Sequence, residues 1–274
     1  MSSDKYIDVA NIIKEKSPGL YRWLPHFVLR YFKKILHESE INGIMSRTGH
    51  LEGLAFAEAA MGELNAQIEP VGLENIPEKG GVILAANHPL GGLDGIAFLL
   101  AVGKKRPDIQ LLVNDVLLNI KNLSSLFVAV NKFGVNPRQA LKIIDDCYAS
   151  DKVTMIFPAG MVSRKLPNGV ADLEWQKSFI SKAKNYQRNV VPVYIDCQNS
   201  NFFYNLSKWR TKFGIKANLE MFYLVDELFK QRNKKVQVCF GKSIAYSTFD
   251  STKSKKQWAA EVRAKVYELA PKGI

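Results

Sequence analysis

The sequence predicts an α/β fold: a central, mostly parallel sheet flanked by helices, preceded by an N-terminal amphipathic helical extension. Three observations support this prediction. From residue 67 onwards, short apolar runs of strand length alternate with longer helical segments, an order that builds parallel sheets covered by helices on both faces. Before that point, residues 19–36 and 53–64 have helical patterns and no strand is expected. A length of 274 residues is ample for one large buried core. From the change of pattern we expect a helical extension over 1–65 and one large α/β domain over 66–274.

Composition limits the classes of protein to which the chain can belong. Hydrophobic residues make up 47% and charged residues 23%, the balance of an ordinary globular protein. The longest apolar stretches are interrupted well before the roughly 20 residues that a membrane-spanning helix needs. The three cysteines are widely spaced, and residues 1–16 lack the basic-then-apolar pattern of a signal peptide. We therefore expect a protein of the reducing cytoplasm that does not cross a membrane.

Within the N-terminal extension, residues 19–36 predict an amphipathic helix. Its apolar residues recur at three- and four-residue steps, and basic residues fall largely on the opposite face. The apolar face is formed by Leu20, Trp23, Leu24, Phe27, Val28, Tyr31, Phe32 and Ile35. Aromatic residues with basic flanks are typical of a helix at a membrane interface, but an apolar face more commonly packs on the protein's own core. Both alternatives stay open at this point.

The remaining elements follow from apolar runs and turn formers. Helices are expected over 53–64, 95–102, 138–149, 173–186 and 254–269, with two more within 202–232. Strands are expected over 67–72, 109–113, 127–130, 153–157, 190–195 and 236–240, and in the apolar run that ends before Asn87. In such sheets, binding sites gather beyond the carboxyl ends of strands. Because His88 and Gly160 each follow a strand, we expect both to face one pocket.

The segment 80–95 is a strand, a turn and a helix with two reactive side chains at the turn. The imidazole of His88 can take a proton near neutral pH, and Asp94 can orient the ring and stabilise its charged form. The glycines Gly91 and Gly92 allow the chain to turn back so that the two residues meet. The alternative is a plain strand–helix turn in which Asp94 only caps the helix and His88 is a loop residue.

Four blocks of sequence, in order, resemble the lysophospholipid and glycerolipid acyltransferase superfamily. Its first block has a His and an Asp with four residues between them, whereas five separate His88 from Asp94 here. The surrounding Asn-His-Pro-Leu-Gly-Gly-Leu-Asp-Gly is similar to the haemolysin-like branch, which includes O-acyltransferases of amino-acid lipids. The family's second, third and fourth blocks are matched in this chain by residues 126–134, 156–164 and 190–195. The resemblance covers roughly residues 70–245.

Two departures from the family pattern bear on the acceptor. The second block lacks its Arg, which leaves Lys132, or Arg138 further on, as the basic residue. In the third block the Glu that belongs to acceptor binding in relatives that use glycerol phosphate is replaced by Ala159. The resemblance therefore favours an acceptor with a carboxylate, such as an N-acylated amino acid with a free hydroxyl, over lysophosphatidate.

The resemblance implies a chemistry and a set of residues. His88 would be the general base on the acceptor hydroxyl, with Asp94 orienting it, and the donor would be a thioester of acyl carrier protein or coenzyme A. No further cofactor and no metal are implied, and direct transfer does not need a Gly-x-Ser-x-Gly elbow. Arg164 is the first candidate for holding an anionic acceptor head. Further substrate-binding candidates are Lys132, Arg138, Gly160, Ser163 and Asn87.

Two other classes of function compete with this interpretation. In a lipid hydrolase or acyl esterase, His88 and Asp94 would serve a serine, for which Ser163 is the candidate. In a non-enzymatic protein that binds anionic membranes, only the basic surface would matter. Arg164, for its part, could be a solvated loop charge.

The positive charge is concentrated near the carboxyl end. Of the formal net charge of +12, residues 201–274 contribute +9, from fifteen Lys/Arg and six Asp/Glu. Such a surface attracts nucleic acid or anionic lipid, or only keeps the protein soluble. No nucleic-acid-binding motif is present, and the acyltransferase resemblance favours lipid. We therefore expect a peripheral protein on the cytoplasmic face of the cell membrane, without a nucleic-acid partner.

Overall fold

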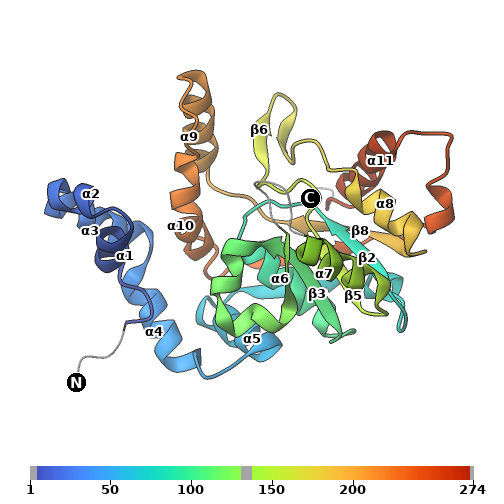
Figure 1. The fold of residues 1–274 in the computed structure, drawn as a ribbon, viewed down its shortest axis with the longest axis horizontal. Coiled ribbons are helices and arrows are strands. Elements are labelled where there is room, and N and C mark those ends of the chain that lie inside the picture. Colours follow the sequence, from blue (N-terminus) through green and yellow to red (C-terminus); the bar gives the residue numbers. More distant parts are fainter. Residues whose placement is uncertain (1–4, 131–137, 272–274) are drawn as a thin grey trace.

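The computed structural model describes residues 5–130 and 138–271. At its centre lies a seven-stranded sheet (Figure 1). The strand order is β1-β9-β8-β2-β5-β3-β4. Neighbouring strands are parallel except β8 and β9, which pair antiparallel. The predicted α/β fold with a mostly parallel sheet is confirmed.

The sheet strands are β1 (Gln67–Val71), β2 (Val82–Ala86), β3 (Ile109–Asn114), β4 (Phe127–Val130), β5 (Val153–Ile156), β8 (Asn189–Asp196) and β9 (Lys235–Phe240). A separate antiparallel hairpin is formed by β6 (Arg164–Leu166) and β7 (Gly169–Ala171). The N-terminal helices are α1 (Val9–Lys16), α2 (Pro18–Trp23), α3 (His26–Ile35), α4 (Glu38–Thr48) and α5 (Gly53–Glu63). The later helices are α6 (Leu93–Gly103), α7 (Arg138–Ala149), α8 (Ser178–Asn185), α9 (Asn201–Lys212), α10 (Leu224–Phe229) and α11 (Lys255–Glu268). Short 3₁₀ helices include η3 (Lys121–Leu126) and η4 (Leu219–Tyr223).

The central strand β2 is buried on both faces, as its uninterrupted apolar sequence predicts. Val82, Leu84 and Ala86 enter the core shared with α5, α6 and α10. Ile83 and Ala85 enter the opposite core, shared with α7, α8 and α11. Successive side chains of a strand point to opposite faces, so this one strand joins both halves of the core. The residues that follow it are therefore held in a rigid position.

The N-terminal extension differs from the prediction at one point. The single helix expected over 19–36 is two helices, because α2 ends at Trp23 and α3 begins at His26. Leu24 has extended backbone angles, φ −76° and ψ 116°. The residue before a proline is excluded from the helical region by the proline ring, and Pro25 follows Leu24. The apolar stripe continues across this break.

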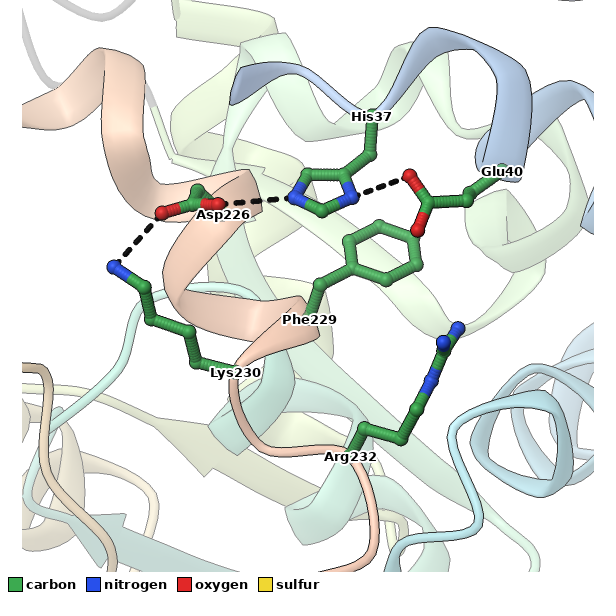
Figure 2. Close-up of a pocket in the computed structure, with 6 residues that line it drawn as sticks. All are labelled: His37, Glu40, Asp226, Phe229, Lys230 and Arg232. Carbon is green, nitrogen blue, oxygen red and sulfur yellow. Dashed lines mark hydrogen bonds and ion pairs between the residues drawn. The ribbon is translucent and has the colours of Figure 1, made fainter. Parts of the chain in front are cut away.

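The extension is fastened to α10 by His37, which lies between α3 and α4 (Figure 2). His37 has a left-handed backbone (φ 49°), and its ring stacks on Phe229 at 4.1 Å. Its Nδ1 lies 2.5 Å from Glu40 Oε2 and its Nε2 lies 3.0 Å from Asp226 Oδ1. Further along the extension, α5 packs against α6 and η3. The division into 1–65 and 66–274 stays a prediction.

Two other boundaries differ from the prediction. Helix α8 begins at Ser178 instead of residue 173, because Trp175 turns inward, with its Nε1 donating to Asp172 Oδ2. The next residue, Gln176, donates its backbone N–H to Pro158 O. The turn formers at 167–169 close the β6–β7 hairpin, a stretch for which no strand was predicted. Helix α6 begins at Leu93, two residues before the predicted start.

Candidate active site

His88 and Asp94 meet beyond the carboxyl end of β2, as predicted. His88 Nδ1 lies 3.0 Å from Asp94 Oδ2, which also accepts the backbone N–H groups of Leu90 and Gly91. Burial disfavours the charged form of Asp94, but the charge of His88, its hydrogen bond and the two N–H groups outweigh burial and hold the pKa of Asp94 below its ordinary value. Asp94 is therefore an anion that fixes the ring through Nδ1. Nε2 is then the ring nitrogen with which His88 can accept a proton.

The turn that brings the two residues together depends on Gly91. Its φ is +97°, a conformation that residues with a Cβ rarely adopt. A Cβ at this position would also meet Val162 and Leu224 side-chain atoms at 3.2 Å. Gly92, by contrast, has an ordinary φ of −85° and needs no special freedom. Of the glycine pair singled out in the sequence, Gly91 is the one that makes the turn possible.

The imidazole is packed against an aromatic ring but is not sealed off. The His88 ring stacks on Phe157 with centroids 4.2 Å apart, and Phe157 follows β5, the neighbour of β2. The His88 side chain keeps 16% of its surface exposed, while the Asp94 side chain is 0% exposed. A buried carboxylate behind a partly accessible imidazole is the arrangement that general-base catalysis needs.

The backbone of His88 is anchored by Asp172, a residue that the sequence analysis did not select. Asp172 is fully buried, and its Oδ1 accepts the His88 N–H at 3.1 Å and the Ser163 hydroxyl at 2.5 Å. Its Oδ2 accepts Trp175 Nε1–H at 2.9 Å. Asp172 lies 84 residues from His88, and its immediate neighbours form no recognised motif. The one signal in the sequence is Trp175, three residues after Asp172, because a buried indole N–H needs an acceptor that a nearby carboxylate can supply.

Ser163 is placed to hold the loop, not to act as a nucleophile. It is 2% exposed, and its Oγ donates to Asp172 Oδ1 and lies 3.3 Å from the backbone oxygen of His88. Its backbone N–H donates to the same oxygen at 2.8 Å. These contacts involve the main chain of His88 and a carboxylate, whereas a triad serine contacts the imidazole. The geometry therefore speaks against the hydrolase alternative.

Asn87 extends the sheet by one residue. Its Nδ2 donates to the backbone oxygen of Ile195 at 3.0 Å, and its Oδ1 accepts the N–H of the same residue at 2.7 Å. Asn87 is 3% exposed, so both ends of its amide are used to tie the end of β2 to β8. These contacts give Asn87 a role in positioning His88; its predicted contact with substrate stays a prediction.

Arg164 belongs to a buried ion cluster and is not a solvated loop charge. Its Nη2 lies 3.2 Å from Glu220 Oε1, and its guanidinium carbon lies 5.7 Å from the centre of the Phe203 ring. Arg210 binds both oxygens of the same carboxylate, with Nε at 2.7 Å from Oε2 and Nη2 at 2.9 Å from Oε1. Two guanidinium groups and one carboxylate leave the cluster with one positive charge in excess. Such an excess favours an anionic group near the loop of Ser163.

The other predicted substrate-binding residues occupy different positions. Gly160 is exposed after β5, with φ +60°, and its N–H donates to the backbone oxygen of Phe157. Arg138 is exposed at the first residue of α7. Lys132 lies outside the described residues. The roles proposed for these three residues stay predictions.

Two hollows in the structure do not include the His88 imidazole in their lining. One, of about 170 Å³, is lined by the His37 group of Figure 2. The other, of about 410 Å³, lies beside Asp172 and Trp175 and is bordered by the basic residues Lys256 and Arg263. Among the described residues there is no group of three or more His, Cys, Asp or Glu that could hold a metal ion. Nor does any helix within 5–130 and 138–271 combine the length and apolar character needed to cross a bilayer.

The fold and this site define an acyltransferase. Residues 11–272 match the family described as Acyltransferase, and the chain belongs to that family. A lyso-glycine lipid O-acyltransferase of Bacteroides thetaiotaomicron is 42% identical over 264 residues, covering 96% of this chain and 97% of that protein. The protein of the same name from Phocaeicola vulgatus is 41% identical over 96% of this chain and 95% of its own length. Both the hydrolase and the non-enzymatic alternatives are thereby disfavoured.

A solved structure shares the architecture. The crystal structure of the 1-acyl-sn-glycerophosphate (LPA) acyltransferase PlsC from Thermotoga maritima matches 96% of this chain and 93% of its own chain, with a TM-score of 0.50. The sequence identity is 19%, so this likeness supports the fold alone. The predicted resemblance to the glycerolipid acyltransferase superfamily is confirmed by the family match and the relatives together.

Proposed function

We propose that this acyltransferase moves a fatty acyl group from the thioester of acyl carrier protein or coenzyme A to the hydroxyl of an N-acyl-glycine lyso-lipid, in membrane lipid biosynthesis. The observation that carries the proposal is the contact of His88 with the buried anion Asp94, in a chain whose relatives are named lyso-glycine lipid O-acyltransferases.

The reaction needs one base and no covalent enzyme intermediate. His88 Nε2 accepts the proton of the acceptor hydroxyl as its oxygen attacks the thioester carbonyl, and Asp94 stabilises the imidazolium that forms. When the tetrahedral intermediate collapses, the carbon–sulfur bond breaks and the imidazolium returns the proton to the thiolate. The products are an ester and a free thiol, so charge and protons balance. No further cofactor takes part in this scheme.

Arg164 is the residue we assign to the carboxylate of a glycine head group. The cluster of Arg164, Arg210 and Glu220 carries one excess positive charge beside Ser163, whose backbone contacts His88. Ala159 stands where relatives that use glycerol phosphate carry a Glu. Together these features support a carboxylate acceptor over a phosphate ester of glycerol. Lys132 and Arg138 stay further candidates for the same head group.

We also propose that the protein is peripheral to the cytoplasmic face of the membrane. The acceptor is a lipid, the N-terminal helices α2 and α3 expose Trp23 and Phe27, and the net charge is +12. An anionic cytoplasmic leaflet attracts such a surface. Deleting residues 1–45 should weaken co-sedimentation with anionic liposomes; undiminished binding would exclude these helices as a membrane attachment.

An assay of the purified protein tests the acceptor and the donor together. N-(3-hydroxyacyl)-glycine, N-(3-hydroxyacyl)-ornithine and lysophosphatidate are each offered with acyl-CoA and, separately, with acyl-acyl carrier protein. The proposal expects the glycine lipid to be acylated with at least one donor. Exclusive use of lysophosphatidate would overturn the acceptor assignment, and turnover with neither donor would overturn the donor class. Ser163→Ala should keep transfer activity, since no step uses that hydroxyl as a nucleophile.

A further inference from the structure

Helix α9 has a second apolar face that its own core does not cover. Phe203 and Tyr204 are buried against the core. Phe202, Trp209 and Phe213, at positions i, i+7 and i+11 of one helical face, are 50%, 65% and 68% exposed. The rings of Trp209 and Phe213 lie 6.3 Å apart. A helix on the surface of a protein in water normally has one apolar face, which packs on the core. A second, exposed apolar stripe therefore indicates a surface that contacts a binding partner.

A similar stripe runs along α2 and α3. Leu20, Trp23, Phe27 and Tyr31 are 58%, 87%, 73% and 46% exposed. Figure 1 shows these helices and α9 projecting from the same end of the molecule, opposite α8 and α11. Segments nearly two hundred residues apart in the chain thus expose aromatic residues at one end of the fold.

The two stripes are joined. The hydroxyl groups of Tyr31 and Tyr223 are 2.6 Å apart, and the rings of Phe32 and Phe222 are 6.4 Å apart. Tyr223 in turn meets the ring of Phe202 at 4.9 Å. The His37 contacts in Figure 2 hold α3 and α10 in this relation. We call the joined surface, residues 18–37 with 201–223, the aromatic platform.

The charge of the platform indicates its partner. Residues 18–37 and 201–223 contain a single acidic residue, Glu220, which is buried. Their basic residues are Arg22, Arg30, Lys33, Lys34, Lys208, Arg210, Lys212 and Lys216. Of these, Lys33 pairs with Glu38, which lies outside the platform, and Arg210 pairs with Glu220 within it. Two copies of this chain meeting through the platform would bring like charges together, which opposes self-association.

We propose that α9 and η4 form a second membrane-contact element, which binds an anionic bilayer together with α2 and α3. Exposed Trp and Phe beside Lys and Arg are the residues that insert at a lipid interface and attract anionic headgroups. The element is fixed to the active-site loop, because Arg210 on α9 and Arg164 on β6 share Glu220. Docking of α9 would therefore hold that loop at the bilayer from which a lipid acceptor comes. This last point rests on the proposed function, whereas the binding itself does not.

Tryptophan fluorescence separates α9 from the N-terminal helices. Of the four tryptophans, Trp175 and Trp258 are buried, which leaves Trp23 and Trp209 as the exposed ones. Trp23→Phe retains Trp209 as the exposed reporter, and Trp209→Phe retains Trp23. Vesicles of phosphatidylcholine and phosphatidylglycerol that contain brominated lipid should quench about a third of the signal of the Trp23→Phe protein, one of its three indoles, and less at high salt. Quenching of Trp23 without quenching of Trp209, or of neither, would overturn the inference.

A binding measurement with a matched control completes the test. Trp209→Ala/Phe213→Ala should weaken co-sedimentation with the same vesicles by roughly tenfold. The control Leu141→Ala/Ile143→Ala removes exposed apolar side chains from α7 and should change nothing. The α9 variant should transfer acyl groups as fast as the parent protein when the substrate is in detergent micelles. If the parent protein itself shows no acyl transfer in this assay, the proposed function fails, and the vesicle-binding result is independent of that failure. Unchanged vesicle binding, or loss of binding to acyl carrier protein or to a second copy instead, would contradict a bilayer partner.

Discussion

Replacing Asp172 by Asn tests whether a buried carboxylate holds the loop of His88. The two residues have nearly the same shape, so the change alters hydrogen bonding with little effect on packing. With its carbonyl oxygen in place of Oδ1, the amide keeps the bonds from His88 N–H and Ser163 Oγ–H. Its NH₂ group then faces Trp175 Nε1–H, where Oδ2 accepted a bond at 2.9 Å. One bond to a charged acceptor is lost and two donors face each other.

The expected loss of unfolding free energy follows from that count. A hydrogen bond to a charged group contributes about 1.5–3 kcal/mol, and a buried donor without an acceptor costs about 1–3 kcal/mol. We therefore expect Asp172→Asn to destabilise the protein by about 2.5–6 kcal/mol, the sum of these two contributions. Trp175→Phe in the same chain removes the facing donor, so the double variant should be more stable than the sum of the single changes predicts, by about 1–3 kcal/mol.

Urea unfolding followed by far-ultraviolet circular dichroism measures these free energies. The control is Glu174→Gln, which removes the same charge two residues away at a side chain that is 66% exposed, and should change stability by less than about 1 kcal/mol. Asp172→Asn should keep most of the transfer activity, because the anchor on His88 N–H survives, whereas Asp172→Ala should lose both stability and activity. Additive effects of Asp172→Asn and Trp175→Phe, or full activity of Asp172→Ala, would refute this reasoning.

Three further predictions follow from the same contacts. Burial raises the pKa of the thiols of Cys147, Cys197 and Cys239. Iodoacetamide near neutral pH should therefore leave the folded protein unlabelled and should label all three thiols when the protein is unfolded. Rapid labelling of the folded protein would contradict the burial of these thiols. The pKa of Asp94 is lowered, so its ionisation stabilises the fold fully above the ordinary value of 3.8 and progressively less as the pH falls below it. The difference in urea midpoint between the parent and Asp94→Asn should therefore narrow as the pH falls through that acidic range, and a difference that does not narrow would contradict the lowered pKa. Asn87→Ala should destabilise the protein by about 1–3 kcal/mol, since it leaves the N–H and C=O of Ile195 without the amide; a neutral change would mean that the two bonds contribute nothing.

The parts of the fold that were predicted are those with a local signal. The strand before Asn87 is a run of five apolar residues, and a strand buried on both faces requires such a run. His88 and Asp94 were paired because they lie on either side of a glycine turn, and Gly91 indeed has the left-handed conformation that the turn requires. The helix over residues 138–149 was predicted with the observed bounds. Each of these features is decided by residues close together in the chain.

The parts that were missed depend on distant partners. Asp172 acts on a residue 84 positions away, and Glu220 pairs with Arg164 across 56 positions, so neither could be selected from its neighbours. Helix α8 begins late because Trp175 is drawn inward to Asp172, a tertiary contact that overrides helix propensity. The break between α2 and α3 was different, since Pro25 was visible in the sequence and its effect on Leu24 is local. That break could have been predicted.

The most direct test of the account is the turnover of His88→Ala with an acyl thioester and the glycine lyso-lipid. A positioned general base contributes about 10²–10⁴-fold to the rate, so the variant should lose that much of kcat while keeping its circular dichroism spectrum and urea midpoint close to those of the parent. His50→Ala, which removes an exposed imidazole elsewhere, is the matched control and should retain full activity. A folded His88→Ala protein with undiminished turnover would contradict the claim that the imidazole held by Asp94 is the base of the reaction.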